Sequence, residues 1–192
     1  MEEVSLETVG RASLCKASPS CVVAVVPVGS ELCMKSPESI TIIETGSKGC
    51  GIVATKHIRK GETIFRFSGE LVPRRKLKNP NTALQLDEDL FLESYGTIDE
   101  NLNHSCNPNC HVDFRQLTLV ALKDIQRGEE LTFDYNTSEY DLMDQGCFFT
   151  CLCGSQDCIG DVRGFKYLPA DHKKKTEPFL LPFLKRKWRK VL

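Results

Sequence analysis

Three cysteines within eight residues form the densest group of reactive side chains in this sequence of 192 residues. They occur as Cys151-Leu-Cys153-Gly-Ser-Gln-Asp-Cys158, where Gly154 lets the chain turn. A segment this short cannot bury enough apolar surface to stabilise its own fold. Thiolates that bind a tetrahedral zinc ion are the usual remedy. The spacing therefore predicts one structural zinc ion with Cys151, Cys153 and Cys158 among its ligands.

The fourth position around this zinc ion must be filled from elsewhere in the chain. The candidates by residue type and position are Cys106, Cys110, Cys147, His104 and His111. The chain has ten cysteines but starts without the basic segment of a secretory signal, so we expect an intracellular protein with metal thiolates rather than disulfides. The spacing alone does not choose among the candidates.

Three further segments have to be considered together with the cysteine cluster. They are Lys48-Gly-Cys-Gly-Ile-Val-Ala54, Asn103-His-Ser-Cys-Asn-Pro-Asn109 and Gly128-Glu-Glu-Leu-Thr-Phe-Asp-Tyr135. In this order, and followed by the cysteine cluster, they resemble the SET-domain protein-lysine methyltransferases that carry a post-SET zinc segment. The resemblance covers residues 38–168, and the second and third motifs together make it very specific.

The resemblance implies that S-adenosylmethionine is the methyl donor. Backbone groups of the glycine-rich turn would contact it, and glycine suits this position because a Cβ atom would prevent close approach. The side chain of Leu152 would pack near the adenine. The residues that the resemblance assigns to this site are Lys48, Gly49, Cys50, Gly51, Asn103, His104, Tyr135 and Leu152.

The resemblance also assigns roles to three other chemical groups. Tyr135 would be the catalytic tyrosine, Phe133 would influence how many methyl groups are added, and Cys106 would be the fourth zinc ligand. A lysine amine must be neutral to accept a methyl group, and a tyrosine hydroxyl can orient it without carrying charge. The activity implied is protein-lysine N-methyltransfer, with a histone lysine as the expected substrate.

Two departures from the family pattern affect the expected pocket. Phe67 stands where many members have tyrosine, so a second active-site hydroxyl is missing or comes from elsewhere, for example from Tyr95. Residues 100–102 replace the Arg-Phe-Ile that often precedes the second motif. The alternative function is a catalytically silent SET module that binds a lysine-bearing peptide or partner, and Phe67 is the residue that favours it.

The elements that must position these residues are predicted to be mainly strands. Short β-branched and aromatic runs between turn residues predict strands at residues 39–44, 52–54, 63–67, 117–122 and 130–135. Residues 74–89 are polar and predict a short helix or an irregular insert, and residues 136–146 predict a linker. The resemblance implies a SET-type fold of several small sheets with a knot-like crossing of the chain.

This pattern divides the chain into four parts. Residues 1–37 are a loosely structured extension, residues 38–137 the SET domain and residues 147–168 the post-SET segment. Residues 169–192 form a basic tail in which apolar residues near helical spacing predict a short helix.

Charge is divided unevenly along the chain. Residues 171–192 carry eight lysines or arginines against two carboxylates, whereas the other residues carry 17 basic against 24 acidic side chains. The acidic body can attract a basic substrate. The tail could contact nucleic acid, but we favour a packed helix with a solvated basic face because its apolar residues need burial. We expect a monomer without a membrane segment, in the nucleus, with the cytoplasm as the alternative.

Overall fold

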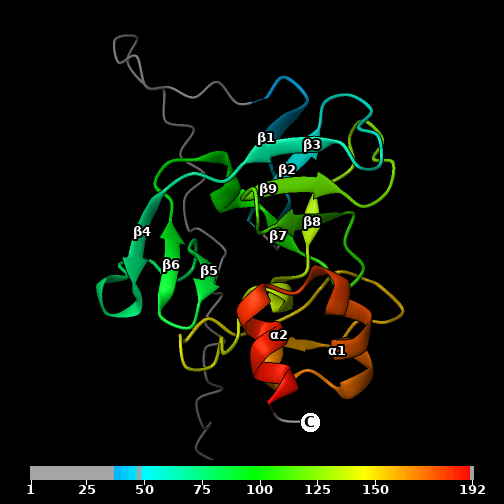
Figure 1. Cartoon of the computed structure of the whole chain (residues 1–192). Coiled ribbons are helices and arrows are strands. Elements are labelled where there is room, and N and C mark those ends of the chain that lie inside the picture. The colour runs from blue at the N-terminus through cyan, green and yellow to red at the C-terminus, as the bar shows by residue number, and fades with distance from the viewer. Residues whose placement is uncertain (1–36, 47–48, 191–192) are drawn as a thin grey trace, which may run out of the picture.

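The computed structural model describes residues 37–46 and 49–190 (Figure 1). The extension predicted for residues 1–37 therefore lies outside this range except for Pro37, and so does Lys48. Among the described residues, none of the helices has the length and apolar character that a membrane crossing requires.

Short strands dominate the described part of the chain, where they form five separate sheets of two or three strands. β1 (Ile40–Glu44) pairs with β2 (Cys50–Ala54), and β8 (Cys110–Asp113), β9 (Thr118–Ala121) and β3 (Thr63–Arg66) form a second sheet. β4 (Glu70–Pro73), β6 (Leu90–Glu93) and β5 (Leu84–Asp87) form a third sheet beside it (Figure 1). These sheets are antiparallel.

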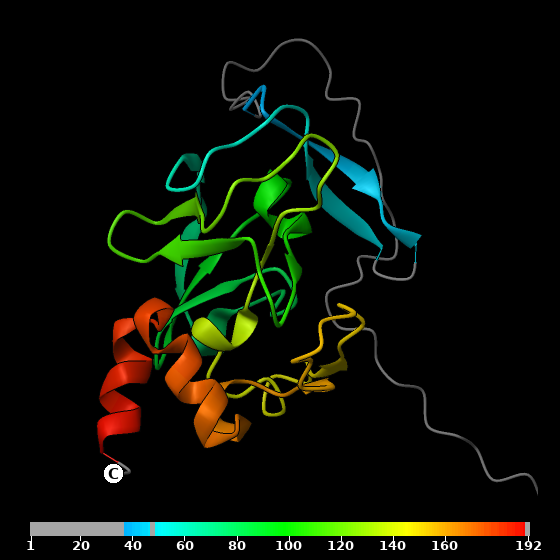
Figure 2. The ribbon, with the colours of Figure 1, turned by 90° about the vertical axis from the view of Figure 1, so that its right-hand side faces the viewer.

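Two very short sheets complete the set. β7 (Asn103–His104) and β10 (Thr132–Phe133) pair in parallel, and β11 (Phe149–Thr150) pairs with β12 (Asp161–Val162) in antiparallel fashion. Single 3-10 turns lie between the strands: η2 (Arg74–Lys76), η3 (Ile98–Asn101), η4 (Tyr135–Thr137) and η5 (Phe165–Tyr167). In the side view, the segment from β11 to β12 lies below the hairpin of β1 and β2, away from the C-terminal helices (Figure 2).

One apolar cluster connects most of these elements. It includes fully buried side chains from several sheets and loops, such as Ile52, Leu119 and Leu131, and it extends to Cys151 and Val162 of the post-SET region. Burying a side chain of this size stabilises a fold by about 1.5–3 kcal/mol. The core therefore holds the second and third motifs in place although their strands, β7 and β10, are only two residues long.

Two predicted segments differ from the structure. Residues 74–89 contain a 3-10 turn and then strand β5 rather than a helix or a wholly irregular insert. The interval predicted to be a linker, residues 136–146, is packed into the protein, and Ser138, Glu139 and Leu142 are almost completely buried. Among its buried polar groups, the Glu139 carboxylate accepts from the Gln85 backbone N–H at 3.2 Å and from the Ser138 hydroxyl at 3.2 Å.

The basic tail forms two helices instead of one. α1 (Ala170–Thr176) is followed by the 3-10 turn η6 (Glu177–Phe179) and by α2 (Pro182–Arg189). Pro182 lies in the first turn of α2, where proline starts a new helix rather than continuing an old one. Phe183 and Leu184 are buried, with Trp188 packed against them, in a second apolar cluster.

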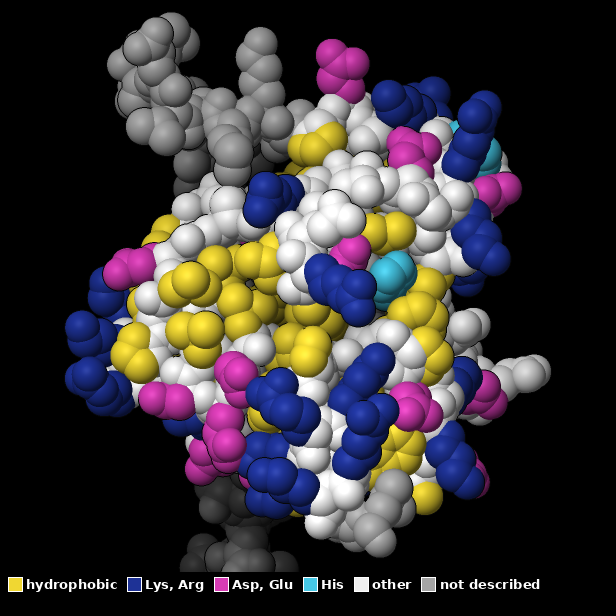
Figure 3. Space-filling model, in the orientation of Figure 1, with side chains coloured by type: hydrophobic (Ala, Val, Ile, Leu, Met, Phe, Trp, Pro, Cys, Tyr) yellow, Lys and Arg dark blue, Asp and Glu magenta, His cyan; other side chains and the backbone are white. Residues whose placement is uncertain are grey.

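The basic face of the tail is partly neutralised by the rest of the protein. Lys and Arg side chains alternate with acidic side chains over α1 and α2 in the space-filling view (Figure 3). Arg186 pairs with Asp87 at 3.1 Å, and Lys187 pairs with Glu88. The β5–β6 turn is thus an acidic docking surface for α2.

Candidate active site

The second and third sequence motifs lie side by side as the parallel pair β7 and β10. Asn103 is opposite Thr132 and His104 is opposite Phe133. The Asn109 side chain reinforces this pairing, because its amide group donates to the Glu130 carbonyl at 2.8 Å and accepts from the Thr132 N–H at 2.9 Å. Segments about 30 residues apart in sequence are thereby fixed against one another.

The glycine-rich turn is attached to the same pair of motifs through Asn103. The Asn103 amide donates to the Cys50 carbonyl at 2.9 Å and to the Glu130 carboxylate at 2.8 Å. A Cβ atom at Gly51 would lie 2.6 Å from the Thr45 side chain and 2.8 Å from the Glu130 carboxylate. These distances are too short for any side chain, so glycine is required where the turn meets the motifs.

Tyr135 follows directly after β10, and only 3% of it is exposed. Its hydroxyl donates to the Leu102 carbonyl at 2.6 Å. Burial raises the pKa of this hydroxyl, and the nearby Glu139 and Glu130 raise it further. Tyr135 therefore stays protonated and neutral throughout the physiological pH range.

A narrow cavity of about 20 Å³ ends against Tyr135. Its walls include the apolar side chains of Phe67, Leu102 and Phe133, and the ring centroid of Phe133 is 4.9 Å from that of Tyr135. The complete lining is Phe67, Asn81, Thr82, Ala83, Leu84, Asp99, Glu100, Leu102, Phe133 and Tyr135. This cavity, called the channel below, therefore combines apolar side chains with polar and acidic ones, and Tyr135 contributes a neutral phenol.

The side chain of Tyr95 is not part of this lining. It is 53% exposed, and its hydrogen bond to Glu93 raises the pKa of Tyr95 to about 12. Among the described residues that line the channel, Tyr135 is therefore the one that contributes a phenol, and Phe67 contributes no hydroxyl.

Four cysteine sulfurs converge beside Tyr135. The Sγ atoms of Cys106, Cys151, Cys153 and Cys158 all lie within 4.8 Å of one another, with Cys106 at 3.7 Å from Cys151 and 4.0 Å from Cys158. Four thiolates bound to one zinc ion at about 2.3 Å stand roughly 3.8 Å apart in a tetrahedron. The donor type, number and spacing all fit zinc.

The two closest sulfurs share a proton in the absence of a metal. Cys106 donates its S–H to Cys151, which raises the pKa of Cys106 and lowers the pKa of Cys151. The His104 ring lowers the pKa of Cys151 further. A metal ion would replace this shared proton, because thiolates are the form that binds metal.

The remaining described cysteines have other surroundings. Cys110 is completely buried in the core, and Cys147 donates from its Sγ to the Asn81 side-chain oxygen at 2.9 Å. Cys50 is disulfide-bonded, which corrects the expectation of reduced thiols at this position. Among the candidates for the fourth position, the described residues bring only Cys106 to the cluster.

Comparison with known proteins assigns part of the chain to a family. A profile described as SET domain matches residues 49–136, the interval that contains both paired motifs and most of the glycine-rich turn. Residues 49–136 therefore correspond to a SET domain. The fold predicted from the sequence, mainly β with several small sheets, is confirmed.

Curated relatives of this chain share about a third of their aligned residues with it. A protein of Yarrowia lipolytica named "Histone-lysine N-methyltransferase, H3 lysine-36 specific" is 32% identical over 149 residues, which cover 68% of this chain and 19% of the relative. A protein of Schizosaccharomyces pombe with the same name is 29% identical over 153 residues, covering 70% and 19%. The chain thus spans about a fifth of the length of these relatives.

Solved structures share the fold. A crystal structure of KRYPTONITE in complex with mCHH DNA, H3(1-15) peptide and SAH superposes with a TM-score of 0.51 at 22% identity, covering 64% of this chain and 29% of that chain. KRYPTONITE in complex with mCHG DNA and SAH gives a TM-score of 0.53 at 23% identity, covering 64% and 28%.

Not every residue predicted for the donor site is fixed by contacts in this SET domain. The side chain of Leu152 is 63% exposed and projects from the segment between two of the clustered cysteines. Sequence reasoning missed Glu130, although it stands inside the third motif, because its role depends on contacts with Asn103 and Gly51 that only the fold creates.

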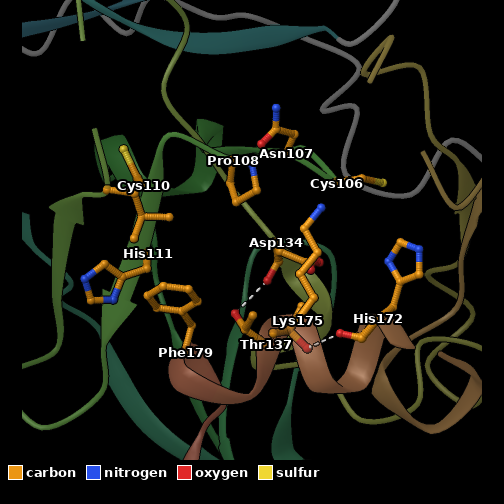
Figure 4. Close-up of a pocket in the computed structure, with 12 residues that line it drawn as sticks. Cys106, Asn107, Pro108, Cys110, His111, Asp134, Thr137, His172, Lys175 and Phe179 are labelled. Atoms are coloured by element: carbon orange, nitrogen blue, oxygen red, sulfur yellow. Dashed lines mark hydrogen bonds between the residues drawn. The ribbon is translucent and has the colours of Figure 1, made fainter. Parts of the chain in front are cut away.

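A second cavity, of about 170 Å³, lies between the Asn103–Asn109 motif and α1 (Figure 4). Asn107 and Pro108 form one wall, and His172, Lys175 and Phe179 form the facing wall. Asp134, one residue before Tyr135, also lines this cavity. α1 and η6 therefore lie against the Asn103–Asn109 motif and Asp134.

Proposed function

We propose that this chain transfers a methyl group from S-adenosylmethionine to the side-chain amine of a lysine in a protein. The observation that carries the proposal is the small cavity whose lining combines aromatic side chains, Asp99 and Glu100 with the neutral Tyr135. The apolar groups suit an aliphatic side chain, and the acidic groups suit an amine at its tip. The channel is joined through β7 and β10 to the glycine-rich turn where the donor would bind.

The channel walls provide what a lysine amine needs for this reaction. Asp99 and Glu100 attract the charged form at the channel, and the apolar walls then disfavour the charge. Deprotonating a free lysine at neutral pH costs about 4 kcal/mol, and desolvation reduces this cost. The Tyr135 hydroxyl donates a hydrogen bond to the Leu102 carbonyl, so its oxygen can accept a hydrogen bond from the lysine amine. This bond would direct the nitrogen lone pair toward the methyl group.

The donor supplies a methyl group bonded to a positively charged sulfur. We assign its binding to Lys48, Gly49, Cys50, Gly51, Asn103, His104, Tyr135 and Leu152. The amine nitrogen forms the new bond to carbon, the carbon–sulfur bond breaks, and the amine proton passes to water. Alignment of nitrogen, carbon and sulfur is then the main task of the protein.

We also propose that Cys106, Cys151, Cys153 and Cys158 bind one structural zinc ion. The convergence of their sulfurs supports this assignment. The domain boundaries at 38–137, 147–168 and 169–192 remain part of the proposal, with the zinc ion tying the second of these segments to the first. We propose a monomer in the nucleus.

A histone is the proposed substrate, and the curated relatives favour the tail of histone H3. Their names specify lysine 36 of H3, and one structural neighbour was crystallised with an H3 peptide. The positively charged histone tails match the acidic groups in the channel wall.

The test is a transfer assay with methyl-labelled S-adenosylmethionine and mixed core histones, followed by mass-spectrometric mapping of the modified residue. We expect label on lysine, in H3, and at least 100-fold less label, as an order of magnitude, with Tyr135→Phe. Donor binding by calorimetry without transfer to histones or to a cell lysate would instead support a silent lysine-binding module. Absence of donor binding would contradict both functions.

A further inference from the structure

His104 lies between the catalytic tyrosine and the cysteine cluster. Its Nδ1 atom is 3.2 Å from the backbone nitrogen of Tyr135, and its Nε2 atom is 3.3 Å from Sγ of Cys106. The ring is buried, and it packs at a centroid distance of 5.3 Å against the Tyr135 ring and 5.8 Å against the Phe149 ring. One imidazole therefore contacts the SET core through Tyr135 and the post-SET segment through Phe149.

The hydrogen bonds determine which nitrogen of His104 carries the proton. A backbone N–H can only donate, so Nδ1 must accept from Tyr135 and is unprotonated. In the neutral ring the proton is then on Nε2, which donates to the sulfur of Cys106. Both hydrogen bonds therefore have a defined direction. Because they occupy both ring nitrogens, neither nitrogen is left to bind the donor.

The Nε2–H group of His104 would affect zinc binding through the Cys106 thiolate. An N–H group directed at a ligating thiolate stabilises its negative charge and fixes the position of its sulfur. The same ring, held in place by that bond, fixes the backbone of Tyr135 and with it the direction of the hydroxyl. Oδ1 of Asp134 lies 3.6 Å from Nδ1 of His104, but both atoms are acceptors in this tautomer, so this contact adds no hydrogen bond.

We propose that His104 is a positioning residue that couples the zinc cluster to the catalytic tyrosine. The Nε2–H group holds the Cys106 thiolate for zinc, and Nδ1 holds the Tyr135 backbone for methyl transfer. This proposal rests on the proposed function, and it adds a role for the His104 side chain to the backbone contacts with the donor assigned to this residue.

Two substitutions separate the halves of this coupling. His104→Asn places an amide oxygen near the position of Nδ1, where it can accept from Tyr135, but the side chain is too short to reach Cys106. His104→Gln places an amide nitrogen near the position of Nε2, where it can donate to Cys106, but it lacks an acceptor at the Nδ1 position. His111→Asn and His111→Gln are the matched controls, since His111 contacts the ring of Phe179 and neither end of the coupling.

We expect His104→Asn to bind zinc about 10- to 100-fold more weakly in competition with a chromophoric chelator. With zinc saturating, its turnover should fall less than that of His104→Gln. His104→Gln should bind zinc with an affinity within about threefold of the unmodified chain and lose about 10-fold or more in turnover. Both His111 variants should leave both quantities unchanged.

Equal losses of zinc affinity and turnover in the two His104 variants would overturn the coupling, and so would loss of the β signal in circular dichroism for both. Unchanged zinc affinity in His104→Asn would overturn it as well. If the unmodified chain transfers no methyl group, the proposed function fails, while the zinc competition still decides whether His104 holds the Cys106 thiolate.

Discussion

The SET core and the post-SET segment hold their functional residues by different means. In the core, Tyr135, Phe133 and Phe67 are almost completely buried in one apolar cluster, and the motif strands are connected through the Asn103 and Asn109 side chains. The post-SET segment, residues 147–168, has two strands of two residues each and one 3-10 turn, and most of its residues are at least partly exposed. Packing holds Tyr135 in place, whereas we propose that the post-SET segment is held by a zinc ion bound to four sulfurs.

The largest expected effect comes from removing one of those sulfurs. Cys158→Ser should lose stoichiometric zinc and reduce methyl transfer by on the order of 100-fold or more, because metal binding stabilises such a segment far more than its packing does. Cys106→Ser should behave in the same way. Zinc content by elemental analysis, transfer rate and the β signal in circular dichroism are measured together, and the β signal should change little.

The controls for this prediction are the two buried cysteines outside the cluster. Cys110→Ala and Cys147→Ala should keep their zinc, since neither sulfur belongs to the converging group. A Cys147 variant that loses zinc while Cys106→Ser keeps it would show that the ligand set is wrong.

The next largest effect tests the core. Tyr135→Phe removes the hydroxyl that donates to Leu102 and should reduce turnover by on the order of 100-fold while donor affinity is kept. The melting temperature should fall by only a few degrees, since one hydrogen bond contributes about 1 kcal/mol. Unchanged turnover would remove Tyr135 from the reaction.

A smaller effect, on product rather than rate, is expected at the adjacent wall of the channel. Phe133→Tyr adds a hydroxyl where the ring lies 4.9 Å from the ring of Tyr135. The added group can restrict a methylated amine, so products should shift toward monomethyl-lysine while the zinc content stays the same. Intact-mass spectrometry of a lysine peptide checks this, and identical product ratios would count against a role for Phe133.

The smallest effect concerns the most exposed residue of the post-SET segment. Leu152→Ala removes a side chain that is 63% exposed, so the stability of the chain should change by less than about 0.5 kcal/mol. If Leu152 packs on the donor, donor affinity should still fall by about 3- to 10-fold. Calorimetric titration with S-adenosylmethionine measures this, and equal affinity would leave Leu152 without a role in binding.

The sequence predicted the regions where chemistry is encoded in residue type. The motifs indicated the family, and the structure brings Cys106 to the three post-SET cysteines as the resemblance implied. The burial of residues 136–146 was not predictable from hydrophobicity, because polar residues such as Ser138 and Glu139 become buried only through the hydrogen bonds that the fold provides. The two bonds of His104 likewise depend on the pairing of β7 with β10.

The sequence predicted one helix of the tail and missed the other, α1. The apolar spacing in residues 180–188 corresponds to α2, but the docking of α2 on acidic residues of β5 and the following turn was not predictable. A contact between residues 99 positions apart leaves no local signal in the sequence.

The contrast between the two regions is tested most directly by hydrogen–deuterium exchange of the unmodified chain with zinc bound and after zinc removal by a chelator. We predict that backbone amides of residues 147–162 lose protection without zinc, that those of β8 and β9 keep theirs, and that restored zinc reverses the loss. Simultaneous loss of protection in both regions, or no change in either, would contradict a packed catalytic core covered by a metal-held segment.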